Sequence, residues 1–178
     1  PQDDSVMQFS EKYSKKIVLR CSRGFAPNIL NFNMPQCNEK ILCFGSDLKS
    51  TITILPNSNC YTSEYIGDLE NYDTYLRYEK TIESYQSIFR FEPEIVLFDA
   101  HPKYISSQLA ESYYNLENPI QYLKIQHHKA HFAAILGEKN LWKTEDKILG
   151  IIWDGIGYGE DGQIWGGEFF EFQNKEMN

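Results

Sequence analysis

The sequence predicts an α/β protein in which a group of strands comes first and helices alternate with strands afterwards. Three short runs rich in β-branched or aromatic residues, at 40–45, 51–55 and 60–66, are separated by turn-forming segments and predict a three-strand meander. A long segment with helical periodicity follows at 68–91. Apolar strand-like runs then alternate with helix-like segments along the rest of the chain.

The helix expected over 68–91 is supported by the spacing of its apolar side chains. These recur every three or four residues, as on the buried stripe of an amphipathic helix, at Tyr75, Tyr78, Ile82, Tyr85 and Phe89. The apolar run that follows is typical of a strand buried on both faces. The remaining expected elements are a strand at 94–99, a helix at 103–114, a strand at 120–126 and a helix at 128–140.

The resulting order, βββαβαβα, is typical of the ribonuclease H-like lobe, which usually occurs in pairs in the actin-like ATPase superfamily. Residues 147–172 repeat the strand, glycine-rich turn and strand of 40–55, so we expect them to open a truncated second lobe. Residues 1–36 offer one short strand at 17–20 and an extended segment punctuated by Gly and Pro. With no initiating Met, the chain is expected to be a fragment.

Composition limits the classes of function. The 178 residues, 42% of them hydrophobic, suit one ordinary soluble domain or one domain with a piece of another. The net charge of −8 argues against a nucleic-acid partner. No apolar run approaches the roughly 20 residues that span a bilayer, so no membrane partner is expected. The four cysteines lack CxxC spacing, which predicts reduced thiols and a cytoplasmic protein.

Three of the four histidines lie in the segment IQHHKAHFAAI, residues 125–135. On a helix, His127 and His131 would share one face with Cβ atoms about 5–6 Å apart, close enough to bind one ion through bonds of about 2.1 Å. Asp154, expected at the carboxyl end of a buried strand, is the candidate third ligand. Two imidazoles and a carboxylate suit Fe(II) or Zn(II). The alternatives are a solvated histidine cluster and an aspartate that caps a turn.

The hairpin at 147–172 is rich in glycine, and such turns can bring backbone N–H groups close to phosphate oxygens. Lys49 and Thr51, in the corresponding loop of the first hairpin, could also contact phosphate. An ordinary hairpin and a solvated turn remain the alternatives. His101 ends a strand beside Pro102, where a capping role is the alternative to a functional one. The candidate nucleotide-binding residues are Lys49, Gly155, Gly157, Gly159, Gly166 and Gly167.

Six segments, in this order, resemble the HypF family of carbamoyltransferases, which act in [NiFe]-hydrogenase maturation: RCSRGFAP, FGSDLKST, SEYIGDLEN, FDAHPKYISS, QHHKAHFAA and DGIGYGEDGQIWGGEF. The resemblance covers nearly the whole chain. It implies that residues 1–27 end a YrdC-like domain and that 28–37 form a linker. It also implies that 38–145 form the first lobe of a TsaD-like carbamoyltransferase domain and that 146–178 form the opening hairpin of its second lobe.

The resemblance implies a reaction as well. Carbamoyl phosphate and ATP would give a carbamoyl-adenylate, whose carbamoyl group passes to the C-terminal cysteine of HypE and becomes a cyanide ligand. The family's metal ligands fall on His127, His131 and Asp154, and the glycines of 157–168 would line the nucleotide. Ile156 stands where the family more often has Thr, which puts a hydroxyl contact in doubt. Because most of the second lobe is missing, this chain alone is expected to be inactive.

Two other interpretations remain open. A TsaD-type or secondary-metabolite O-carbamoyltransferase shares the paired histidines and the later aspartate, although SRGFAP at 22–27 favours the HypF family. A non-catalytic module that binds nucleotide or metal is the alternative from another class. Transfer activity and its dependence on the histidines would separate these interpretations.

Overall fold

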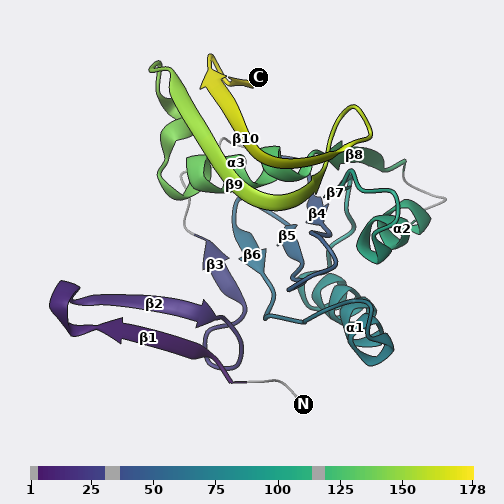
Figure 1. The fold of residues 1–178 in the computed structure, drawn as a ribbon. Helices are drawn as coiled ribbons and strands as arrows, with labels where there is room; N and C mark the ends of the chain where they lie inside the picture. Colours follow the sequence, from purple (N-terminus) through teal and green to yellow (C-terminus); the bar gives the residue numbers. More distant parts are fainter. Residues whose placement is uncertain (1–3, 31–36, 114–118) are drawn as a thin grey trace.

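The computed structural model describes residues 4–30, 37–113 and 119–178. Its centre is a six-stranded mixed sheet with the order β3-β6-β5-β4-β7-β8 (Figure 1). Strands β4, β7 and β8 are parallel, while β5, β6 and β3 pair antiparallel. The strands are β3 (Asn28–Leu30), β4 (Ile41–Cys43), β5 (Thr53–Leu55), β6 (Cys60–Thr62), β7 (Ile95–Asp99) and β8 (Gln121–Ile125). The five strands from β6 to β8 confirm the predicted ribonuclease H-like order.

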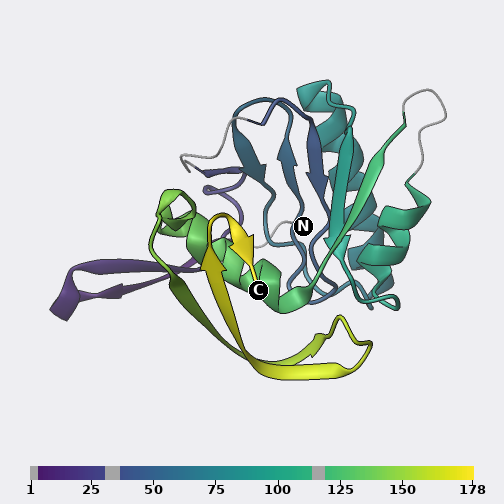
Figure 2. The ribbon, with the colours of Figure 1, turned by 90° about the horizontal axis from the view of Figure 1, so that it is seen from above.

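Helices α1 (Tyr72–Phe89) and α2 (Ile105–Ser112) pack on one face of this sheet (Figure 2). The predicted stripe of α1 is confirmed, because Tyr78, Ile82 and Tyr85 are buried in the core. The helix begins later than predicted because the side chain of Asn71 accepts a hydrogen bond from the backbone N–H of Thr74 and caps it. The sheet contributes these core residues: Leu42, Ile54, Val96 and Phe98.

The N-terminal region contains more strand than the sequence predicted. Strands β1 (Val6–Ser10) and β2 (Lys15–Arg20) form a separate antiparallel hairpin that projects from the sheet (Figure 1). Only 17–20 was predicted, because most side chains of both strands are exposed and no burial pattern marks them. Residues 28–30, expected to begin the linker, instead pair with β6 as an edge strand. Residues 31–36 of that linker lie outside the described residues.

A second, smaller core joins helix α3 (His127–Glu138) to the C-terminal hairpin. The hairpin consists of β9 (Ile148–Tyr158) and β10 (Ile164–Gln173), with the short β11 (Glu176–Met177) at its edge. Figure 1 shows α3 between the hairpin and the central sheet. Two buried residues of α3 and two of β10 form the second core: Phe132, Leu136, Phe170 and Phe172.

Candidate metal centre

The candidate site lies where the parallel strands end. Because β4, β7 and β8 are parallel, the segments that follow them meet at one edge of the sheet. Asp99 ends β7, and His127, two residues after the end of β8, is the first residue of α3. Strand β9 lies against α3 and brings Asp154 to the same edge.

Three side chains converge on one point, as the sequence predicted. The Oδ2 atom of Asp154 lies 3.1 Å from Nε2 of His127 and 3.6 Å from Nε2 of His131. The two Nε2 atoms are 3.2 Å apart. Ligands with bonds of about 2.1 Å to one ion lie about 3.0 Å apart at a right angle and about 3.4 Å apart at the tetrahedral angle. The three distances therefore fit a shared divalent cation.

Asp154 reaches this point through a strand irregularity rather than from a strand end. The prediction that Asp154 lies at the carboxyl end of a buried strand is wrong, since β9 continues to Tyr158 and most of its residues are not buried. Trp153 pairs with Gly167 and Gly157 with Trp165, so residues 154–156 of β9 face the single residue between those partners. Such a bulge changes the direction of a side chain within a continuous strand. The backbone N–H of Gly155 also donates to Oδ1 of Asp154 over 2.7 Å.

Asp99 belongs to the site, although the sequence analysis did not identify it. Its Oδ2 lies 2.7 Å from Nδ1 of His127, and its Oδ1 accepts a hydrogen bond of 2.8 Å from the backbone N–H of His101. A carboxylate on the outer nitrogen of a metal-binding imidazole fixes the ring and turns its Nε2 lone pair towards the metal. The available signal was an acidic residue at the carboxyl end of a predicted parallel strand.

The electrostatics of the three candidate ligands differ. The hydrogen bond to Asp99 raises the pKa of His127 above its usual range, despite burial. Burial and the neighbouring His127 lower the pKa of His131, which keeps its Nε2 lone pair available. Burial opposes ionisation of Asp154, but the Gly155 N–H and the adjacent imidazoles outweigh it and lower the pKa of this carboxyl. The arrangement therefore favours a carboxylate beside at least one neutral imidazole.

The other candidate polar residues lie outside the triad. His128 is fully buried, and its Nδ1 contacts the side chain of Gln126 over 3.0 Å. The ring of His101 stacks on the ring of Tyr104, with centroids 4.1 Å apart, near the same edge of the sheet. It forms a T-shaped contact with the ring of Tyr158, with centroids 5.3 Å apart. Lys49 is exposed in the loop after β4, with a left-handed φ of 54°.

The glycines predicted to contact nucleotide fall into two groups. A Cβ atom on Gly157 would lie 2.8 Å from Nδ1 of His128, and one on Gly159 would lie 2.5 Å from Cδ1 of Trp165. Packing against these rings therefore explains both glycines. In contrast, a Cβ at Gly155 would meet nothing within 4 Å, and the nearest atoms for Gly166 and Gly167 are 3.8 Å away. Nucleotide contact by any of the five remains a prediction.

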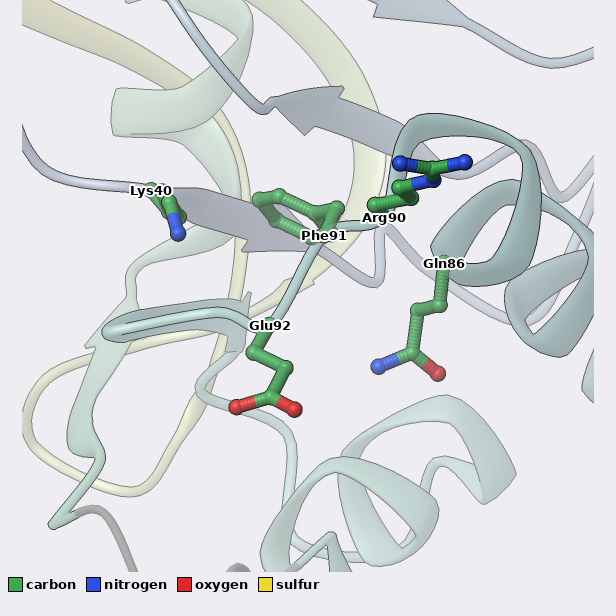
Figure 3. A pocket seen from close by; sticks show the side chains of 5 residues that line it. All are labelled: Lys40, Gln86, Arg90, Phe91 and Glu92. Carbon is green, nitrogen blue, oxygen red and sulfur yellow. The ribbon is translucent and has the colours of Figure 1, made fainter.

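A cavity of about 410 Å³ lies away from this site (Figure 3). Its lining includes Lys40, which precedes β4, and Phe91, which precedes β7, so it lies at the opposite edge of the sheet. Figure 3 shows Arg90 and Glu92 beside Phe91, with Gln86 of α1 nearby. None of the three metal-ligand candidates lines it, so the cavity is separate from the candidate metal centre.

Two family models match most of this chain. The HypF Kae1-like domain family matches residues 36–138, and the family described as "Carbamoyltransferase, Kae1-like Domain, second subdomain" matches 150–178. Carbamoyltransferase HypF of Synechocystis sp. is 39% identical over 96% of this chain and 21% of its own length. The probable carbamoyltransferase HypF of Methanocaldococcus jannaschii is 35% identical over 98% of this chain and 22% of its own length.

Solved structures of HypF also match this chain. Full-length HypF, crystallised in a phosphate- and nucleotide-bound form, matches with a TM-score of 0.84 and 33% identity, over 99% of this chain and 22% of that chain. HypF of T. kodakarensis matches with a TM-score of 0.79 and 34% identity, over 96% and 21% respectively. The chain thus spans about a fifth of its relatives. No helix in the described part of the chain is long and apolar enough to cross a membrane. The chain belongs to the HypF carbamoyltransferase family.

Proposed function

We propose that this chain forms the metal-binding part of an enzyme that transfers a carbamoyl group to the C-terminal cysteine of HypE. The observation that carries the proposal is the convergence of His127, His131 and Asp154 from two distant segments of the chain. Their three ligand atoms lie within 4.8 Å of one another. Carbamoyl phosphate and ATP are the proposed substrates, with a carbamoyl-adenylate as the activated intermediate.

Asp99, His131 and Asp154 have different proposed roles at the site. Asp99 accepts a hydrogen bond from the Nδ1–H of His127, so that the opposite nitrogen faces Asp154 and His131. Burial and the neighbouring His127 lower the pKa of His131, which favours its neutral imidazole, the form that can bind a metal. Asp154 supplies the negative charge. A bound Fe(II) or Zn(II) would supply a template and a Lewis acid for the carbamoyl group of the adenylate.

The nucleotide is proposed to lie beside the bulge of β9. Gly155, Gly166 and Gly167 support this location, because the space above their Cα atoms is open and lets a ligand approach the backbone closely. Lys49 lies in the loop that follows β4, at the same edge of the sheet as Asp99, and is the proposed cation for phosphate. The related full-length HypF was crystallised with phosphate and nucleotide bound, which agrees with this proposal.

The test uses the complete protein that contains this chain, labelled carbamoyl phosphate, ATP and HypE. We expect the unmodified protein to label the HypE cysteine, and His131→Ala and Asp154→Asn each to lose bound metal and at least about 100-fold of the transfer rate. Asp73→Asn, an exposed acid in the first turn of α1, is the matched control and should change neither.

Each alternative has its own outcome in this experiment. Variants that lose the metal but keep the transfer rate would contradict the proposal and favour a binding module. Label that passes to a hydroxyl acceptor but not to HypE would favour the TsaD-type or O-carbamoyltransferase interpretation. The 178-residue chain alone should show no turnover.

A further inference from the structure

The side chain of Gln126 joins the helix that carries the paired histidines to the strand that carries Asp154. Its Oε1 accepts a hydrogen bond of 2.8 Å from the backbone N–H of Lys129, which caps α3. Its Nε2 donates over 3.1 Å to the backbone carbonyl of Tyr158, at the end of β9. The same Nε2 lies 3.0 Å from Nδ1 of His128. Gln126 is only 5% exposed, so these bonds are shielded from water.

The two backbone partners determine which way the amide points. The N–H of Lys129 requires the oxygen on its side, and the carbonyl of Tyr158 requires the nitrogen on the other. The second hydrogen of Nε2 is then directed at Nδ1 of His128, which must accept and therefore carries no proton. Every polar atom of the Gln126 side chain thus has a partner.

The residue type at this position also indicates a second role besides capping. Asn, Asp and Ser are the side chains that usually cap a helix N-terminus. They are too short to cap α3 and also reach the next strand. Asn71 provides the ordinary case, since it caps α1 through Thr74. The longer Gln126 side chain does the same for α3 and reaches Tyr158 as well.

Strand β9 runs antiparallel to the first turns of α3. At one end, Gly150 lies so close to Phe132 that a Cβ there would be 2.7 Å from the ring. At the other end, Gly157 lies even closer to the buried ring of His128. Asp154 lies between these two contacts and faces the histidines. Two polar contacts hold this end of β9 against α3: the bond from Gln126 to Tyr158 and, just beyond the strand, an ion pair between Lys129 and Glu160. The Glu160 side chain is exposed, whereas Gln126 is buried.

We propose that Gln126 is a positioning residue of the metal centre: it holds β9 against α3 so that the Asp154 carboxylate stays within reach of both histidines. This inference rests on the proposed metal site. Gln126→Glu is the informative change, because the carboxylate has the same shape and still accepts from Lys129. It has no N–H for Tyr158, and two facing acceptors repel each other.

The experiment measures Co²⁺ binding to the complete protein by competition with a chelating dye and by the visible absorption of the bound ion. The signal of His131→Ala is subtracted as the baseline for other metal sites. We expect Gln126→Glu to bind Co²⁺ about 10- to 100-fold more weakly and to change its absorption bands. Asn71→Ala, which removes an ordinary helix cap, is the matched control and should stay within about twofold of the unmodified protein.

A second measurement does not depend on metal. In the metal-free protein, amide hydrogen exchange of a peptide spanning 148–158 should be at least about tenfold faster in Gln126→Glu, since the end of β9 loses its partner. If Gln126→Glu does not fold, Gln126→Ser replaces it, because serine still caps a helix but cannot reach Tyr158.

The outcomes separate this inference from the proposed function. Co²⁺ affinity and spectrum within twofold of the unmodified protein would overturn the positioning role. If the unmodified protein gives no more signal than His131→Ala, the proposed metal site itself fails. In that case the exchange measurement decides whether Gln126 holds β9: faster exchange supports the link to Tyr158, and unchanged exchange refutes it.

Discussion

Replacing Gly157 with alanine tests how closely β9 must approach α3. The added Cβ would lie 2.8 Å from Nδ1 and 3.0 Å from Nε2 of His128, whereas non-bonded heavy atoms normally approach to about 3.5 Å. The ring is fully buried and cannot swing into solvent. Because Cε1 of the same ring lies closer still, strand and ring must separate by at least about 0.7 Å, which is more than the roughly 0.5 Å that a binding site tolerates.

Two quantities should change in Gly157→Ala. The free energy of unfolding should fall by about 1–3 kcal/mol through overpacking, measured by urea titration of the 178-residue chain. Metal affinity of the complete protein should fall at least about tenfold, because Asp154 lies three positions away on the displaced strand. Dye competition with Co²⁺ measures the second effect.

Gly155→Ala is the matched control on the same strand. A Cβ at Gly155 would meet nothing within 4 Å, and the alanine keeps the N–H that Asp154 accepts. Since an alanine at a compatible position restricts the unfolded chain, we expect stability unchanged or raised by about 0.4–1 kcal/mol. Equal effects of the two substitutions on stability and metal affinity would refute the packing argument for Gly157.

Three further predictions concern other parts of the molecule. Asp99→Asn should weaken metal binding about 10- to 100-fold at pH 7.5. Because the bond to Asp99 raises the pKa of His127, protons compete with metal at higher pH in the unmodified protein, and in the variant the affinity should reach its plateau at lower pH. A pH series of metal titrations measures this, and identical profiles would contradict it. Asp47→Ala removes a buried carboxylate that accepts from two backbone N–H groups of α2 at 2.9 Å each, so the free energy of unfolding should fall by about 2 kcal/mol in urea titrations. The exposed Asp73→Ala should change it by less than about 0.5 kcal/mol, and a similar loss in both would count against the cap. Burial raises the pKa of the Cys60 thiol to about 11, so at pH 8 about 0.1% is thiolate, against about a quarter of a free cysteine with a pKa near 8.5. Alkylation of Cys60 in the native protein, followed by mass spectrometry, should be at least about 200-fold slower than in a free cysteine peptide, and comparable rates would show that the thiol is accessible.

Sequence periodicity predicted the first lobe well because its elements are amphipathic or fully apolar. The stripe of α1 and the apolar run of β7 are local patterns that burial imposes directly on the residue order. The β1–β2 hairpin was not predicted in full. Its exposed apolar side chains follow neither pattern, since in the described residues they lie outside both buried cores.

The paired histidines were predictable for the same local reason. A spacing of four residues puts His127 and His131 on one face of any helix, whatever surrounds it. The glycines of β9 show the limit of such reasoning. Their spacing suggested a phosphate-binding turn, but at Gly157 and Gly159 the close neighbours are the rings of His128 and Trp165.

By itself, the sequence determined the order of the elements, the family motifs and the helical spacing of the two histidines, because these depend on residues that are near one another in the chain. Only the tertiary structure decided that Asp99 contacts His127, that a bulge directs Asp154 to the site, and that Gln126 reaches Tyr158. These contacts depend on how β9 lies along α3. That register is fixed by side-chain packing and hydrogen bonds between segments far apart in the chain, which no local pattern encodes.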